Sequence, residues 1–198
     1  MLMNKTGHDS FIAFKKQIIL MKKTILLLLI LFTVKISWAQ YKPVEQASAL
    51  KFTIKNLGFG VDGSFSGFEG SINFDPQNLA VSNFDVTIAA ASVNTDNGLR
   101  DEHLKGESYF DVKNYPRIRL ASAKIVATNK NGIYQFTGQL IIKGKSKPVS
   151  FTFTSAPATD GYIFKGSFKM NRRDFGIGGT STISDELEVM INVTAKKA

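Results

Sequence analysis

The sequence has no cysteine, and its 198 residues include only two histidines and one tryptophan. Without cysteine the chain cannot form disulfide bonds, cysteine-ligated zinc or iron–sulfur centres, a thiol nucleophile or a lipid anchor on an N-terminal cysteine. With 43% hydrophobic and 21% charged residues, the composition is that of a globular protein. It excludes a collagen, a disordered chain and a multi-pass membrane protein.

One apolar run of eleven residues, Thr24–Val34, lies near the N-terminus. It is too short for a membrane-spanning helix, which needs about 20 residues. A basic Met-Lys-Lys segment precedes the run and small residues ending at Ala39 follow it, which is the pattern of a secretory signal peptide. We therefore expect a signal over 21–39, behind an upstream extension. Cleavage near Ala39 should release the protein into the periplasm or the medium, with no stable membrane insertion.

Removal of residues 1–39 changes the charge of the protein. These residues contain six lysines and one aspartate, so residues 40–198 keep 19 basic and 15 acidic side chains and a net charge of +4 instead of +9. A charge of this size, spread along one domain, does not provide the clustered basic face that nucleic-acid binding needs. We expect residues 40–198 to form one domain with no nucleic-acid partner.

Phenylalanine is abundant, with 16 copies in the chain. Many of them recur at every second position, which is the spacing of residues on one face of a β-strand. Eight segments alternate in this way: 52–54, 68–74, 84–88, 118–120, 134–142, 149–153, 162–170 and 187–193. Turn sequences separate them, and one short helix is expected around 96–104, between the third and fourth strands. The pattern predicts an all-β fold of eight antiparallel strands, closed as a barrel or packed as a two-sheet sandwich.

The same alternation assigns side chains to the interior. An eight-stranded barrel is either filled by side chains or holds one small ligand, and alternation alone leaves both possibilities open. Gly138 shares its parity with Phe136 and Leu140, so we expect it to face the lumen while Gln139 faces solvent. If the lumen is hollow there, a tryptophan at position 138 should fit into the space.

Few side chains are available for catalysis. The Gly58–Gly63 segment spells a dinucleotide-binding fingerprint, but the residues after it cannot start the helix that would hold a pyrophosphate. His103 is the one histidine that remains without residues 1–39, and no Gly-x-Ser-x-Gly segment presents a serine to it. One histidine without cysteine does not make a typical zinc site. We expect a protein that is not an enzyme and has neither a metal site nor a cofactor.

Several motifs occur together in a defined order. The central one is Asn97–Leu104, which contains Arg-Asp-Glu-His-Leu, followed by Tyr109-Phe110-Asp111 and Tyr115-Pro116. This arrangement resembles the signature of the YceI-like family. Further matching segments lie at 67–76, 138–149 and 172–177, so that the resemblance extends over about residues 41–196.

The resemblance implies an extended lipocalin-like barrel of eight antiparallel strands. It also implies a periplasmic or secreted protein that holds a long apolar chain, a polyisoprenoid or isoprenoid quinone, and has no established catalytic residue. We therefore expect a carrier or sequestering protein for an isoprenoid or other long-chain lipid. Two alternatives remain open: a ligand-free structural or stress-protection domain of the cell envelope, and a lipid-processing enzyme that acts through His103.

The candidate binding residues form two groups. Inward parity gives the candidate lining residues of the lumen: Phe52, Phe68, Phe74, Phe84, Phe136, Gly138, Phe151, Phe153, Phe164 and Phe168. Alternation does not tell which of these pack at the floor of the barrel. The short helix and the later Arg172–Ile177 segment give candidates for the rim, where the polar head of a lipid would lie. These are Arg100, Asp101, His103, Leu104, Phe110, Arg172 and Phe175.

Overall fold

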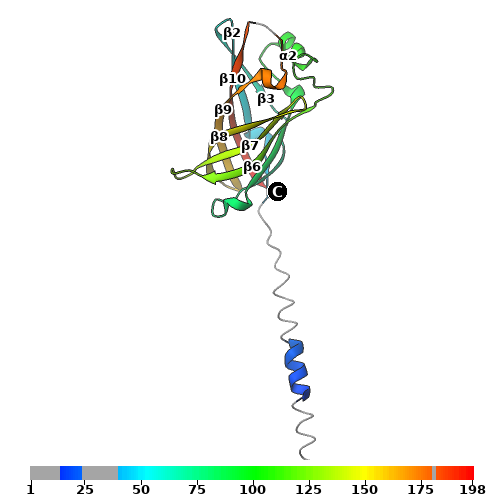
Figure 1. Cartoon of the computed structure of the whole chain (residues 1–198), viewed down its shortest axis with the longest axis vertical. Coiled ribbons are helices and arrows are strands. Elements are labelled where there is room, and N and C mark those ends of the chain that lie inside the picture. Colours follow the sequence, from blue (N-terminus) through cyan, green and yellow to red (C-terminus); the bar gives the residue numbers. More distant parts are fainter. Residues whose placement is uncertain (1–13, 24–39, 180–181) are drawn as a thin grey trace, which may run out of the picture. The chain divides into compact units, whose positions relative to one another are not determined.

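The computed structural model describes residues 14–23, 40–179 and 182–198 (Figure 1). Residues 14–23 form a helix, and they belong to a different compact unit from the residues that begin at Ala39. No helix in the described ranges is long and apolar enough to cross a membrane. The apolar run and cleavage site of the expected signal peptide, over 24–39, lie outside the described residues.

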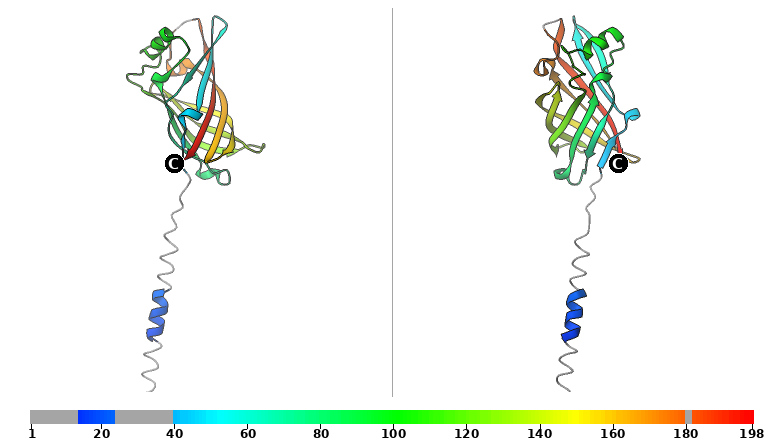
Figure 2. Two further views of the ribbon diagram at one scale, coloured as in Figure 1. Left: turned by 180° about the vertical axis from the view of Figure 1, so that it is seen from behind. Right: turned by 90° about the vertical axis from the view of Figure 1, so that its right-hand side faces the viewer.

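The residues from Gln40 onward form one closed antiparallel sheet. Its strands are β1 (Gln40–Pro43), β2 (Ala49–Asn56), β3 (Phe59–Phe65), β4 (Glu69–Asn73), β5 (Asn83–Ala89), β6 (Arg117–Ala127), β7 (Ile133–Ile142), β8 (Lys145–Ala158), β9 (Gly161–Asn171) and β10 (Ile183–Lys197). Their order in the sheet is β1-β4-β5-β6-β7-β8-β9-β10-β2-β3, and β1 also pairs with β10. This additional pairing closes the sheet into a barrel (Figures 1 and 2).

The ten strands occupy eight positions around the barrel. β1 and β2 follow one another along the same side of β10, because β2 pairs with residues 183–192 and β1 pairs with residues 195–197. The next position is divided in the same way: β3 pairs with β2, and β4 pairs with β1. The predicted barrel of eight antiparallel strands is therefore confirmed, and the two additional strands arise from breaks in the first two positions.

The expected short helix is present as α2 (Gly98–Lys105), in the connection between β5 and β6. Asn97 begins it, since its side chain accepts a hydrogen bond from the backbone N–H of Arg100 at 3.0 Å. This is the usual role of an asparagine before a helix, where the first N–H groups have no partner within the helix. The helix thus starts two residues after the expected position and ends one residue after it.

The connections between strands gather at two ends of the barrel (Figures 1 and 2). The β2–β3 turn, α2, the β7–β8 turn and the 3₁₀ helix η4 (Arg172–Phe175) lie at one end, which we call the upper end. The 3₁₀ helix η2 (Leu79–Val81), the β6–β7 and β8–β9 hairpins and the C-terminus lie at the other end, the lower end.

The two halves of the barrel are closed differently. In the lower half β4 pairs with β5 along its whole length. In the upper half β3 is linked to the segment after β5 by a short bridge between Ser64 and Asn94. The residues that follow α2 cover this side, and the ring of Phe110 packs edge-to-face on Phe65 with centroids 5.3 Å apart. Side chains of the α2 region therefore form part of the upper wall.

Many aromatic rings pack together in the lower half. Phe74 lies among Tyr134, Tyr162 and Phe164, with a centroid distance of 5.2 Å to each ring and nearly perpendicular planes. Such edge-to-face contacts are favourable beyond the area that they bury. Burial raises the pKa of the Tyr162 phenol above its ordinary value, so this group stays neutral at physiological pH. We call these four residues the floor cluster, because their rings pack together in the lower half.

Candidate ligand-binding cavity

The upper half of the barrel contains a cavity of about 180 Å³, which we call the upper cavity. Its wall consists almost entirely of apolar side chains from the strands and from the α2 region. They include Leu50, Phe52, Ile54, Phe68, Leu104, Tyr109, Phe110, Ile118, Leu140, Phe168, Met170 and Leu187. Several of these, such as Leu50 and Met170, line the interior and yet are only half-buried. The space that they border is therefore not filled by neighbouring side chains.

One charged residue of the wall, Arg172, is fully engaged within the protein. It is 4% exposed, and its guanidinium donates to the carbonyl oxygens of Ile177 at 2.7 Å and Ser184 at 3.0 Å. The same group pairs with the Asp185 carboxylate at 2.9 Å. These contacts join η4 to the start of β10 at the upper end, so the role of Arg172 is to hold the wall of the cavity together.

Arg100, in the first turn of α2, also lines the upper cavity. Its Nε donates to the Thr95 hydroxyl at 2.7 Å and its Nη2 donates to the Thr95 carbonyl oxygen at 2.6 Å. The Thr95 hydroxyl in turn donates to Asp101 at 2.6 Å. No carboxylate within the described ranges forms an ion pair with Arg100. Its guanidinium thus places a positive charge at the wall of an apolar cavity, linked to the Asp101 carboxylate through the Thr95 hydroxyl.

A smaller cavity of about 50 Å³ lies below the first, and we call it the lower cavity. Its wall includes the rings of Phe84, Phe136, Phe151, Phe153 and Phe164. Five side chains line both cavities: Phe68, Val86, Leu120, Ile191 and Val193. We call these five side chains the partition, because they lie between the two spaces.

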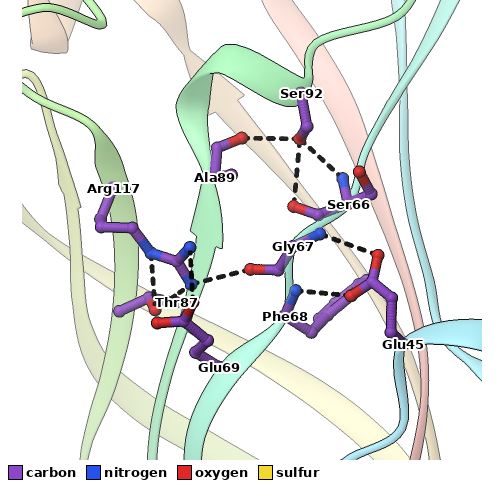
Figure 3. Close-up of polar contacts among 9 residues, drawn as sticks. All are labelled: Glu45, Ser66, Gly67, Phe68, Glu69, Thr87, Ala89, Ser92 and Arg117. Carbon is purple, nitrogen blue, oxygen red and sulfur yellow. Dashed lines mark hydrogen bonds and ion pairs between the residues drawn. The ribbon is translucent and has the colours of Figure 1, made fainter.

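Phe68 is positioned by polar side chains rather than by strand pairing (Figure 3). It belongs to the segment that joins β3 to β4 outside either strand. The carboxylate of Glu45, on the 3₁₀ helix η1 (Glu45–Ala47) between β1 and β2, accepts hydrogen bonds from the N–H groups of Gly67 at 2.8 Å and Phe68 at 2.7 Å. Arg117 donates to the Gly67 carbonyl oxygen at 2.7 Å. Glu45 therefore connects the segment between β1 and β2 to the segment between β3 and β4, which are the two places where a strand position is interrupted.

Gly67 is required by the geometry of this junction. Its φ is +73°, a backbone conformation that glycine adopts far more readily than other residues. A Cβ at this position would also lie 2.7 Å from the Cβ of Ala89. The close approach of β5 to the junction is thus possible because residue 67 has no side chain.

The predicted lining residues are divided between the cavities and the floor. Phe52, Phe68 and Phe168 line the upper cavity, while Phe84, Phe136, Phe151, Phe153 and Phe164 line the lower one. Phe74 lines neither cavity, which corrects its assignment, because its ring is enclosed by the other members of the floor cluster. Parity assigns the side of the sheet on which a residue lies but not its height in the barrel.

Gly138 also departs from the expectation. It is buried and Gln139 is exposed, as their parity predicts, yet Gly138 lines neither cavity. A Cβ at position 138 would collide with the carbonyl oxygen of Ala121 and would approach the Phe136 ring to 2.8 Å. The expectation that Gly138 borders a space able to hold a tryptophan is therefore wrong, because the neighbouring strand and this ring already occupy it.

Four of the seven rim candidates line the upper cavity: Arg100, Leu104, Phe110 and Arg172. The other three do not. Asp101 accepts the Thr95 hydroxyl, His103 is exposed with its ring 4.9 Å from that of Tyr109, and Phe175 is buried in the core. The two lining residues of α2 are four positions apart and so share one face of the helix, whereas Asp101 and His103 lie on other faces.

Several residues of the cavity wall were not among the candidate lining residues named from the sequence. Leu50, Ile54, Met170 and Leu187 share the inward parity of named neighbours, so alternation could have included them. Glu45 lies in a segment without alternation, and no sequence signal marks its contact with Gly67 and Phe68. Within the described residues no group of three or more histidine, aspartate or glutamate side chains could hold a metal ion.

Comparison with known protein families identifies this barrel. The family model of the YceI-like domain matches residues 41–195. The chain belongs to the YceI-like family. A UPF0312 protein of Yersinia pestis is 32% identical over 157 residues, which are 75% of this chain and 80% of the relative. A UPF0312 protein of Photorhabdus laumondii is 36% identical over 105 residues, and the match spans about half of each protein, 52% of this chain and 54% of the relative.

Solved structures of YceI-like barrels have the same fold. BcnA of Burkholderia cenocepacia superposes with a TM-score of 0.72 at 26% identity, covering 76% of this chain and 98% of BcnA. The YceI protein of Campylobacter jejuni gives a TM-score of 0.61 at 33% identity, covering 70% of this chain and 86% of the other. A polyisoprenoid binding domain from Saccharophagus degradans gives 0.67 at 12% identity, covering 82% and 100%, a likeness of fold alone. The resemblance inferred from the motifs is confirmed.

The environment of Gly138 predicts the effect of a very small substitution. Gly138→Ala should lower the free energy of unfolding by about 1–3 kcal/mol, because the added methyl group overpacks the contact with Ala121 and Phe136. Gln139→Ala, at the neighbouring exposed position, should change it by less than about 0.5 kcal/mol. Chemical denaturation of both variants checks this. Unchanged stability in Gly138→Ala would mean that the space beside Phe136 is open after all.

The Glu45 contacts predict a difference in stability between two glutamate-to-glutamine variants. Glu45→Gln leaves one acceptor oxygen for two N–H groups, so we expect a loss of about 1–2 kcal/mol in the free energy of unfolding. Glu69→Gln is the matched control, because Glu69 pairs with Arg117 at 3.3 Å and its side chain is 72% exposed. An exposed pair of this kind contributes about 0.5 kcal/mol or less. Equal losses in the two variants would contradict the role assigned to Glu45.

Proposed function

We propose that this YceI-like protein binds a long-chain amphiphilic lipid, an isoprenoid or isoprenoid quinone, with the apolar chain in the upper cavity. The observation that carries the proposal is the cavity itself, about 180 Å³ bordered by apolar side chains above a floor of packed aromatic rings. Each methylene group removed from water contributes about 0.8 kcal/mol. Family membership, and a fold shared with a protein described as a polyisoprenoid binding domain, support the same class of ligand.

The size of the upper cavity limits how much of a chain it holds. A cavity of about 150 Å³ lined by aliphatic and aromatic side chains binds a molecule of the size of benzene. The upper cavity, at about 180 Å³, therefore holds roughly one or two isoprene units. A longer chain extends out of the cavity or displaces side chains of the interior.

The polar head of the lipid has a partner in Arg100. This side chain lines the upper cavity, and its Nη1 group is not committed to Thr95, which is contacted by Nε and Nη2. A hydrogen bond from a guanidinium to an oxygen of the ligand contributes roughly 1.5–3 kcal/mol. The combination of one cationic donor and an apolar cavity is suited to an amphiphile rather than to a pure hydrocarbon.

We propose further that the protein is exported and carries or sequesters its lipid in the periplasm. The signal-like sequence over 21–39 supports export. Three apolar side chains at the upper end are strongly exposed: Leu57 and Phe59 beside the β2–β3 turn, at 69% and 78%, and Leu99 on α2, at 89%. Exposed apolar groups favour brief contact with a membrane surface, where a lipid could enter or leave the protein.

Extraction of the native protein tests the ligand. We expect protein purified from its own cell envelope to yield about one isoprenoid lipid per chain on organic extraction and mass spectrometry, and its N-terminus to be Gln40. Folded protein without lipid would favour the ligand-free envelope domain. A lipid that is chemically converted on incubation, and is no longer converted by His103→Ala, would favour the enzyme.

Two substitutions on α2 test the assignment of the polar head. Arg100→Met keeps an unbranched apolar side chain and removes the donor, so the affinity for a prenol or quinone should fall about tenfold. His103→Ala removes an exposed ring outside the cavity, and the affinity should stay within about twofold. Competition binding measures both variants. An unchanged affinity in Arg100→Met, or a large loss in His103→Ala, would place the polar head elsewhere.

A further inference from the structure

The upper and lower cavities are adjacent, because the five side chains of the partition line both of them. Phe68 is the one ring among these five, and the other four are aliphatic. It is half-buried, because part of its surface faces the cavities. The width of the barrier between the two spaces therefore depends mainly on this ring.

The backbone that carries Phe68 is fixed at one height in the barrel. Its N–H group and that of Gly67 donate to Glu45, and the Gly67 carbonyl oxygen accepts from Arg117. These hydrogen bonds come from outside the strand ladder and do not involve the cavity. The ring is thus a barrier at a defined position.

Below the partition the lower cavity is lined mostly by apolar side chains, and Pro43 and Lys165 also belong to its wall. The rings of Phe136 and Phe151 stack at 4.8 Å, and Phe84 lies 5.1 Å from Phe164. Phe164 is also a member of the floor cluster and contacts Phe74 with a centroid distance of 5.2 Å. The lower cavity therefore has the chemistry needed for the end of a hydrocarbon chain.

We propose that the lower cavity is a second compartment for the end of the lipid chain and that Phe68 determines the length of chain that the protein holds. This inference rests on the proposed lipid-binding function and adds selection by length to it. A chain that ends at the partition fills the upper cavity. A longer chain gains burial only if it replaces the Phe68 ring between the two spaces.

Removal of the ring should change the preference for chain length. Phe68→Ala joins the two cavities, and each additional methylene group that becomes buried raises the affinity by about fourfold. Phe110→Ala is the matched control, because Phe110 is also half-buried and lines the upper cavity alone. Its removal enlarges the upper cavity beside α2 and leaves the partition intact.

The test uses the full chain and three prenols of one, two and three isoprene units, which bracket the capacity of the upper cavity: prenol, geraniol and farnesol. Each protein is incubated with equimolar mixtures, and native mass spectrometry measures the ratio of the bound prenols. We expect Phe68→Ala to shift this ratio at least about tenfold toward the longer prenols relative to the parent. Phe110→Ala should shift it by less than about twofold.

An unchanged ratio in a Phe68→Ala protein that still binds prenols overturns the role of Phe68 and leaves the lipid-binding function standing. Failure of the parent to bind any prenol overturns the proposed function itself. If Phe68→Ala does not fold, Phe68→Leu takes its place in the test, because leucine is smaller than phenylalanine but still makes an apolar contact. It should shift the ratio in the same direction by a smaller factor, and an unchanged ratio there overturns the inference.

Discussion

The hydrogen bonds from Gly67 and Phe68 to the Glu45 carboxylate hold two interrupted strand positions together at one level of the barrel. Below this level β1 and β4 complete the ring of strands, and aromatic rings occupy most of the interior. Above it β3 reaches the segment after β5 by a short bridge, and side chains of the α2 region line the interior. The division of the barrel into a packed floor and a cavity follows from the place where these strands break.

The upper cavity has an energetic cost. At roughly 24 cal/mol for each Å³, an unfilled volume of this size lowers stability by about 4 kcal/mol compared with a packed interior. That is a large part of the roughly 5–15 kcal/mol by which a typical domain is stable. A ligand that binds the folded protein alone stabilises it. A ligand of the proposed class in the upper cavity would therefore offset part of this cost.

The sequence predicted which residues of each strand face the interior better than it predicted how far along the barrel axis each of them lies. Alternation identified eight strand positions because one face of each strand is apolar, and the inward parity of Phe136 and Gly138 is correct. It could not separate Phe74, which lies in the floor, from Phe168, which lines the upper cavity, because both have the same parity. The strand breaks were not predicted, since they depend on contacts between Glu45 and residues more than twenty positions away. Alternation also does not report the close approach of a neighbouring backbone, which excludes Gly138 from the cavity.

Both ends of the folded domain meet at the floor of the barrel. The N–H of Ala198 donates to the carbonyl oxygen of Gln40 at 2.8 Å, and β1 pairs with the last residues of β10. The end of the chain is therefore at the opposite end of the barrel from α2 (Figure 1). An affinity tag, a fused protein or a solid support attached at Ala198 therefore lies at the opposite end of the barrel from α2, so the domain can be immobilised with the α2 region unobstructed.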